Sequence, residues 1–248
     1  TSDVSAWDVR RVEYMAWMFH GASSFTSDVS AWDVSSVETM RSMFNGASSF
    51  NVDLSPWDVS HVKNMDYMFY GASSFNSDVS SWDVSSATTF MYTFHGCSSF
   101  NSELENWDTS SSTDFDSTFK DATTFNRGIS SWDISNSDSF DQMFEGATAF
   151  YQTLCWSLPT GASTTSIFKE SSGAVNPDCH QCLAGEYRVE NRSAAYVSLT
   201  DSSYSCSKSM TVPGATACEV AANYVGIRWA GEFEDITNAY GCVQTYGT

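Results

Sequence analysis

The sequence predicts an α/β repeat solenoid followed by a small disulfide-rich module. Three observations lead to this fold class. Tryptophan recurs every 25 residues, the apolar spacing within each repeat alternates between a helical and an extended pattern, and six of the seven cysteines lie from residue 155 onward. We therefore expect a repeat domain over residues 1–172 and a cysteine-rich C-terminal module over residues 173–248.

The repeat is defined by its tryptophans, of which six stand 25 residues apart and a seventh follows after 24. They are Trp7, Trp32, Trp57, Trp82, Trp107, Trp132 and Trp156. The columns that begin at Val4, Phe19 and Phe25 also keep an apolar residue in each repeat. Because one repeat cannot bury its own apolar side, we expect the repeats to stack and to build a continuous core from like residues.

Each repeat is expected to contain one short helix and one short strand. In the second repeat the apolar residues are spaced i, i+3, i+4 and i+7, which is one face of a helix. These residues are Met40, Met43, Phe44 and Ala47. Ser35 occupies the expected N-cap position of this helix, and Gly46 occupies the position at which the helix is expected to end. Residues 53–59 indicate an extended segment, and residues 157–172 a degenerate last helical turn that closes the stack.

Two segments carry a family resemblance. Residues 75–85 read Phe-Asn-Ser-Asp-Val-Ser-Ser-Trp-Asp-Val-Ser, and residues 65–72 follow the pattern Met-x-x-Met-Phe-x-Gly-Ala. The chain resembles the BspA-like leucine-rich repeats, also called the DUF285 repeat family, over roughly residues 1–172. The resemblance implies a leucine-rich-repeat-like coil and a surface-exposed protein linked to adhesion, with no catalytic role. The sequence departs from the pattern where Asp121 replaces the glycine after the helix.

The cysteines after residue 154 indicate a disulfide framework, because they form an even set in a short segment. They are Cys155, Cys179, Cys182, Cys206, Cys218 and Cys242. The Cys-x-x-Cys run at residues 179–182 also has the form of a redox pair or half a zinc site, although no second ligand pair is evident. Cys97 lies in a column of alanines, and we expect it to be a buried free thiol.

The C-terminal module also resembles, over residues 218–226 and 241–242, a small disulfide module of secreted algal and protist proteins. Asn191 begins an Asn-Arg-Ser sequon for N-glycosylation. The resemblance and the sequon favour a secreted or cell-surface glycoprotein.

Aspartates form ladders along the repeat. One follows the tryptophans and consists of Asp8, Asp33, Asp58, Asp83, Asp108 and Asp133. Stacked carboxylates repel one another, so a ladder of this kind needs compensation. Two interpretations stay open: the carboxylates face helix N-termini and backbone amides, or they hold bridging Ca²⁺ ions between repeats. No other cofactor is indicated.

The aromatic residues outside the core pattern suggest a ligand surface. We expect the tryptophan column to be buried, since stacking demands a uniform column, with sugar stacking as the alternative. Trp17 shares its column with Tyr67 and Tyr92, and these three form a candidate aromatic surface on the helical side. His20 and His95 share a column with polar residues, which is typical of a solvated position.

The composition and the motifs argue against several classes of protein function. The formal net charge is −19 and the pI is near 4.2, which disfavours nucleic acid as a partner. With 42% hydrophobic residues the chain has enough apolar surface to fold, yet it has no apolar run long enough to insert into a membrane. No catalytic motif occurs in a supporting context, so we do not expect an enzyme.

The expected function is therefore binding or assembly. We expect a secreted or cell-surface structural or adhesion protein that binds surface proteins or assembles head to tail with copies of itself into a fibre. The chain opens at Thr1 inside a repeat, which predicts either further repeats upstream or stacking on another subunit. The alternative is a glycan-binding module, and a third hypothesis is a regular surface that binds ice or mineral.

Overall fold

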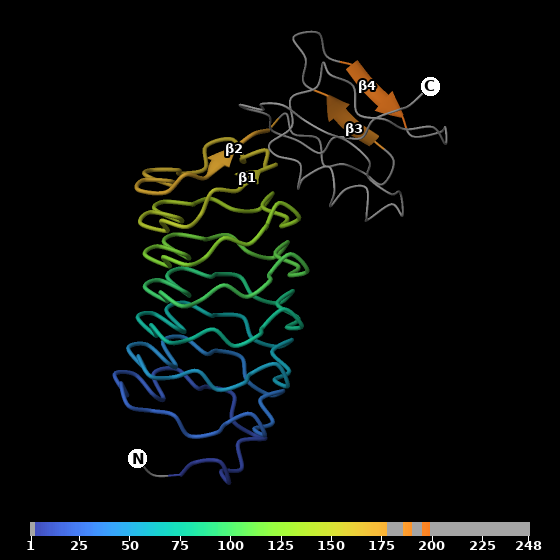
Figure 1. Cartoon of the computed structure of the whole chain (residues 1–248). Coiled ribbons are helices and arrows are strands. Elements are labelled where there is room, and N and C mark those ends of the chain that lie inside the picture. The colour runs from blue at the N-terminus through green and yellow to red at the C-terminus, as the bar shows by residue number, and fades with distance from the viewer. Residues whose placement is uncertain (1–2, 178–185, 190–194, 199–248) are drawn as a thin grey trace, which may run out of the picture. The chain divides into compact units, whose positions relative to one another are not determined.

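The computed structural model describes residues 3–177, 186–189 and 195–198. The chain divides into two compact units, Thr1–Asn176 and Pro177–Thr248. In the first unit, successive repeats lie side by side as coils, which Figure 1 traces from the N-terminus upward. We number these coils 1 to 7 by their tryptophans, from Trp7 to Trp156.

Regular elements are few among the described residues. Strand β1 (Thr153–Leu154) pairs in parallel with β2 (Ala174–Val175), and β3 (Glu186–Val189) pairs antiparallel with β4 (Ala195–Ser198) in the second unit. Between coils the parallel contacts are single bridges, such as Tyr14↔Thr39 and Thr39↔Asn64. The bridging residue of each coil, Asn64 in the third, lies outside the extended segment expected at residues 53–59, which contains no strand or bridge.

The helix expected in each repeat is absent: the described residues contain hydrogen-bonded turns where helices were predicted. The reason lies in the backbone of each turn segment. Ser42 has a φ of 54° and Gly46 a φ of 73°, so the turn segment of this coil contains two left-handed residues four positions apart. An α-helix needs consecutive right-handed residues and cannot form through these positions. The serine that was expected to cap a helix, Ser35, therefore has no helix to cap.

The turn segments direct alternate amides to the neighbouring coil. In coil 2 the N–H groups of Ser42, Phe44 and Gly46 donate to carbonyl oxygens of coil 3, at 2.8, 2.8 and 2.6 Å. The intervening amides, such as Met43 N to Met40 O at 3.0 Å, close tight turns within the coil. Backbone groups that a helix would satisfy internally are thus shared between coils.

The side chains predicted to face inward do so, although the backbone that carries them differs. Met40, Met43, Phe44 and Ala47 are fully buried. The phenylalanine columns are continuous: Phe44 stacks on Phe69 at 5.7 Å between ring centroids and on Phe50 of its own coil at 4.0 Å. Burial of each such side chain stabilises the fold by about 1.5–3 kcal/mol. The predicted core columns are confirmed.

The tryptophan column is also confirmed as core, since every member from Trp32 to Trp156 is buried. Each of these indoles donates its Nε1–H to a carbonyl oxygen of the preceding coil. Trp82 Nε1, for example, lies 2.9 Å from Leu54 O. A second ladder runs through the asparagines, where Asn51 Oδ1 accepts from Asn76 N at 2.8 Å and the pattern repeats in the next coils. Both ladders fix the register between coils.

The last coil continues the same hydrogen-bonding pattern with one residue fewer. Gln142 N donates to Thr165 O, and Phe144 N donates to Ile167 O, each at 2.8 Å. Phe168 stacks on Phe144 with ring centroids 5.4 Å apart. β2 then lies beside β1, because Ala174 pairs with Thr153.

Candidate functional site: a tyrosine ridge on the repeat stack

One lateral face of the stack carries an aromatic cluster that does not belong to the core. Tyr67 and Tyr92 stack with ring centroids 4.7 Å apart and planes within 5°. Tyr70 and His95 form a second stack at 4.5 Å beside the first. Arg41 lies over the other face of Tyr67, with its guanidinium carbon 5.4 Å from the ring centroid. We call these five residues the tyrosine ridge.

The ridge is positioned by the left-handed turns. Tyr67 and Tyr92 occupy the column that begins at Trp17, and both have φ values near 55°, at 55° and 58°. The residue in this column is left-handed in each coil, and whereas the short side chains of Ser42 and Ser117 are buried there, the longer side chains of Tyr67 and Tyr92 are only partly buried. Ring stacking between neighbouring coils then becomes possible, and such pairs contribute about 0.5–1.5 kcal/mol.

Charged groups at the ridge are paired. Arg41 donates to Asp66 Oδ2 at 2.8 Å, and Asp66 also accepts from Thr89 Oγ1 at 2.6 Å. On the far side, Lys120 Nζ donates to Gln142 Oε1 at 2.8 Å and lies 3.6 Å from Glu145 Oε1. The ridge is therefore nearly neutral on a chain whose net charge is strongly negative.

His95 departs from the solvated position that its column suggested. Its side chain is only 15% exposed, and its Nε2 lies 3.7 Å from Asp121 Oδ2. Burial lowers the pKa of His95, and its Nδ1 has no hydrogen-bond partner within the described residues. The neutral imidazole therefore serves as a flat partner for Tyr70.

The predicted aromatic surface is brought together only in part. Tyr67 and Tyr92 are in contact, whereas Trp17 lies two coils from Tyr67 and packs edge-on against His20 at 5.0 Å. Trp17 is 52% exposed. Sequence reasoning missed Arg41, Tyr70 and His95. The single column that contains Tyr70 and His95 was visible in the sequence, but the stacking of these two rings depends on the turn geometry.

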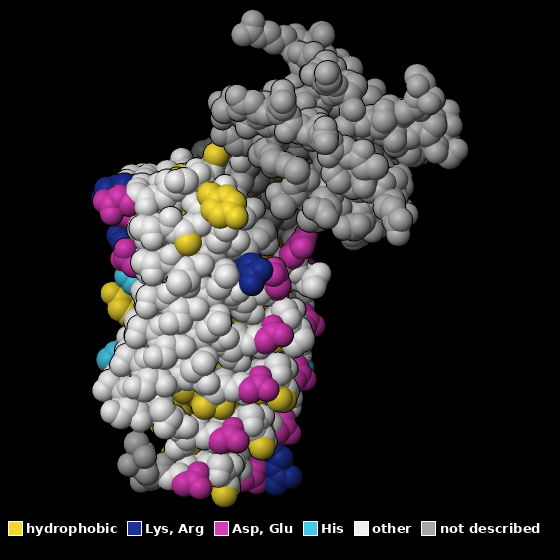
Figure 2. All heavy atoms as spheres, in the orientation of Figure 1, with side chains coloured by type: hydrophobic (Ala, Val, Ile, Leu, Met, Phe, Trp, Pro, Cys, Tyr) yellow, Lys and Arg dark blue, Asp and Glu magenta, His cyan; other side chains and the backbone are white. Residues whose placement is uncertain are grey.

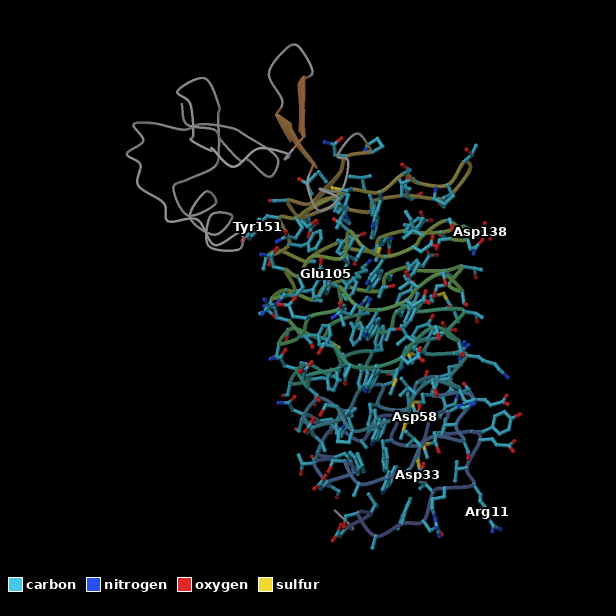
Figure 3. The ribbon with its side chains drawn as sticks, turned by 90° about the vertical axis from the view of Figure 1, so that its right-hand side faces the viewer. Arg11, Asp33, Asp58, Glu105, Asp138 and Tyr151 are labelled. Atoms are coloured by element: carbon cyan, nitrogen blue, oxygen red, sulfur yellow. The ribbon has the colours of Figure 1, made fainter. Side chains whose placement is uncertain are left out.

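The aspartate ladder is an array of local turns rather than helix caps. Asp33 Oδ1 accepts from Ser35 N at 3.2 Å and from Ser35 Oγ at 2.6 Å, and Asp58 does the same with Ser60. These serine hydrogen bonds lower the pKa of both carboxyls. Figure 3 shows Asp33 and Asp58 one above the other on the same side of the stack. The backbone amides that were predicted as partners are present, without the predicted helices.

The remaining members behave alike. Asp108 and Asp133 accept from the amides of Ser110 and Ser135 at 3.0 and 2.9 Å, and Asp83 from Ser85 N at 3.1 Å. Asp8 is paired with Arg10, whose side-chain hydrogen bonds lower the pKa of Asp8 to about 2. Figure 2 shows acidic side chains in columns along the stack.

No three acidic, histidine or cysteine side chains in the described part of the chain are grouped so that they could hold a metal ion. Ca²⁺ bridging between coils therefore remains a hypothesis that rests on the ladder alone. Among the same residues, no helix has the length and apolarity needed to cross a membrane.

The cysteines divide between the two units. Cys97 is a buried free thiol, as predicted, and burial raises its pKa while its Sγ lies 2.9 Å from Phe69 O. Cys155 is disulfide-bonded. Five predicted disulfide residues, Cys179, Cys182, Cys206, Cys218 and Cys242, lie outside the described residues, as does the glycosylation residue Asn191.

The stacked coils and their repeated columns define a repeat protein. The family described as "Mycoplasma protein of unknown function, DUF285" matches residues 1–103 and 77–180, which is more than half of the chain. The chain therefore belongs to the DUF285 family, in agreement with the BspA-like repeat pattern. No curated protein and no solved structure matches it. The resemblance of the C-terminal module to secreted algal proteins is not confirmed by these comparisons.

Proposed function

We propose that the chain is a secreted or cell-surface structural or adhesion protein that binds other proteins through the tyrosine ridge. In this proposal, residues 1–172 act as a leucine-rich-repeat-like solenoid that holds the ridge rigid, and residues 173–248 form the disulfide-rich module. Tyrosine and arginine are the residue types that dominate binding energy at protein interfaces. They lose little side-chain entropy on binding when stacking has already ordered them.

One observation carries the proposal: bulky aromatic residues stand at left-handed positions without contributing to the core. A left-handed conformation costs roughly 1–2 kcal/mol for a residue with a Cβ atom. The same column holds serine at Ser42, Ser117 and Ser166, so the fold does not require an aromatic residue there. Because every coil has a left-handed residue in this column, the feature that distinguishes Tyr67 and Tyr92 is the bulky, partly exposed aromatic ring and not the backbone conformation.

An extracellular setting is supported by three features. Cys155 is disulfide-bonded, and disulfides persist in oxidising compartments. The sequence contains a sequon at Asn191 and carries a net charge of −19. The proposed function needs no small-molecule cofactor.

Assembly with copies of itself is a second form of the same proposal. In coils 2 to 7 the turn segments accept hydrogen bonds from the preceding coil, for example at Arg41 O and Met43 O. These hydrogen bonds join backbone groups and do not depend on side chains, so a coil of another copy can take part in them as well. Electron microscopy of native material tests this form: filaments support it, and monodisperse monomers at high concentration contradict it.

Glycan binding is supported by a different observation, the half-exposed ring of Trp17. Both faces of Tyr67 are covered, by Arg41 and by Tyr92, so a sugar has no free face to stack on there. A glycan array distinguishes this function. Saturable binding that disappears with Trp17→Ala supports it, and unchanged binding contradicts it.

The test of protein binding uses Lys120, which lies beside the ridge. Native protein is added to the cells that produce it, amine cross-links are formed, and the cross-linked residues are identified by mass spectrometry. We expect intermolecular cross-links to concentrate at Lys120 and to disappear in a Tyr67→Ser/Tyr92→Ser variant. The matched control is Tyr151→Ser, which removes an exposed tyrosine of coil 7, three coils beyond Tyr92. Cross-links that are unaffected by the ridge variant contradict the proposal.

A further inference from the structure

The tyrosine ridge brings three phenol groups together. The ring centroids of Tyr67 and Tyr92 are 4.7 Å apart, and that of Tyr70 lies 5.9 Å from Tyr67 and 6.3 Å from Tyr92. Tyr14 and Tyr151 are exposed, and within residues 3–177 no ring contact joins either of them to another tyrosine. In this part of the chain the ridge is therefore the place at which one phenol can react with another.

The backbone holds Tyr67 and Tyr92 at equivalent positions of neighbouring coils. Tyr67 N donates to the carbonyl oxygen of Met91, the residue before Tyr92, at 2.9 Å. The φ values of the two tyrosines are 55° and 58°, and their ring planes differ by 5°. Both side chains are partly exposed. The two rings therefore face each other as a parallel stack that a small reagent can reach from the surface.

Tyr70 is placed differently from this pair. Its ring plane is inclined by 41° to that of Tyr67 and by 46° to that of Tyr92, and its own stacking partner is His95 at 4.5 Å. A link between Tyr67 and Tyr70 would join two residues of one coil, whereas a link between Tyr67 and Tyr92 would join coil 3 to coil 4. The closest and most nearly parallel pair is the one that bridges the coils.

Two phenols in contact can be joined by oxidation. Burial and the neighbouring phenol of Tyr92 raise the pKa of Tyr67, so its hydroxyl is protonated at neutral pH. An oxidant that takes an electron and this proton from each phenol leaves two phenoxyl radicals, whose unpaired spin extends to the ring carbons Cε1 and Cε2. A bond between one such carbon of each ring, followed by transfer of its hydrogen to the phenolic oxygen, gives dityrosine.

We propose that Tyr67 and Tyr92 form a modification site at which oxidation by hydrogen peroxide and a peroxidase joins coils 3 and 4 through a dityrosine bond. Two phenols and one peroxide give one dityrosine and two water molecules: each tyrosine loses one hydrogen atom, one C–C bond forms and the O–O bond breaks. The rings must tilt toward each other to form the bond, and the stack holds them close beforehand. The inference goes beyond the proposed function, because it needs no partner protein.

The test oxidises the whole chain, at low concentration, with a peroxidase, hydrogen peroxide and a small diffusible electron carrier. An endoproteinase that cleaves before aspartate then separates the two tyrosines, because aspartates lie between them in the sequence. Tyr67 is in the fragment 66–77 and Tyr92 in the fragment 83–107. We expect mass spectrometry of the monomeric fraction to find these two fragments linked, with the loss of two hydrogen atoms.

Single-atom variants identify the reacting phenols. Tyr92→Phe keeps the stacked ring and removes the hydroxyl, so the protein should stay folded while the linked fragments are lost. Tyr67→Phe should have the same effect, although Tyr70 remains in the same fragment. Tyr70→Phe and Tyr151→Phe are the matched controls and should leave the yield of linked fragments unchanged.

Linked fragments that persist in Tyr67→Phe would overturn the inference, because Tyr70 would then be the reacting phenol. Oxidation of Tyr151 in the native chain without linkage of the two fragments would overturn it as well. The proposed function fails in a different way. If dityrosine forms but the cross-links at Lys120 do not depend on the ridge, the coupling site stands and the proposed function falls. If those cross-links depend on the ridge but dityrosine does not form, the reverse holds.

Discussion

Replacing Trp82 by phenylalanine tests the indole ladder that joins the coils. Trp82 is 4% exposed, and its Nε1 donates to Leu54 O at 2.9 Å. The substitution removes this bond and leaves a smaller ring in the same place. Leu54 O keeps a second donor, Trp57 N at 3.1 Å, so the carbonyl is not orphaned. The loss is therefore that of one buried hydrogen bond rather than the larger penalty of an unpaired group.

The expected magnitude follows from these contacts. A net hydrogen bond contributes about 1 kcal/mol, and the cavity beside the smaller ring costs about another 1 kcal/mol. We therefore expect Trp82→Phe to lower the free energy of unfolding by about 2 kcal/mol in urea titrations followed by near-ultraviolet circular dichroism.

The matched control is Trp7→Phe. Trp7 is 51% exposed, and its indole donates no hydrogen bond within the described residues. The expected change is below about 0.5 kcal/mol, as for an ordinary surface substitution. Equal effects of the two substitutions would refute the reasoning, because they would show that the indole bond between coils contributes nothing.

Three other perturbations have defined outcomes. Gly46→Ala should lower the free energy of unfolding by about 1–2 kcal/mol, since φ is +73° there, whereas Gly128→Ala, where an added Cβ meets nothing, should be nearly neutral in the same titration. Five aspartates of the ladder should lose their stabilisation in acid, because their folded pKa values lie below the ordinary 3.8, with Asp8 at about 2; their contribution is present above pH 4 and falls between pH 4 and 2. They are Asp8, Asp33, Asp58, Asp108 and Asp133. In Asp58→Asn the melting temperature should therefore depend less on pH across that interval. If Ca²⁺ bridges the ladder, a chelator should lower the melting temperature of the native chain, and an unchanged temperature would exclude the bridging ions.

The core could be predicted from the sequence because stacking imposes its own pattern. Side chains of the same column contact one another in neighbouring coils, so they must keep a similar shape. The columns of Phe44, Phe50 and the buried tryptophans can therefore be recognised in the sequence by their fixed spacing. The same argument identified Cys97 as buried, since it replaces alanine in an inward column.

The helices could not be rejected from the sequence, because the inward positions of a helix and of these turns coincide. Met40, Met43 and Phe44 face the core in either case. What differs is the sign of φ at Ser42 and Gly46, and only the glycine hints at it. Propensity and periodicity describe one coil, whereas the competing hydrogen bonds come from the next.

The candidate site could be predicted only as a column. Tyr67 and Tyr92 were identified because they share a position in neighbouring repeats. Their partners come from adjacent columns, and the contact of Arg41 with Tyr67 depends on a side chain that crosses from one coil to the next. Sequence spacing does not reveal which of several neighbouring columns a long side chain will reach.

The most direct test of the account is to identify the hydrogen-bond acceptors of the turn segment by scalar couplings across hydrogen bonds in nuclear magnetic resonance spectra. The account predicts that the amide of Phe44 couples to the carbonyl of Met68 in the next coil. A coupling from Phe44 to the carbonyl of Met40, four residues earlier in the same coil, would contradict it, because it would restore the helix and remove the left-handed column that supports the tyrosine ridge.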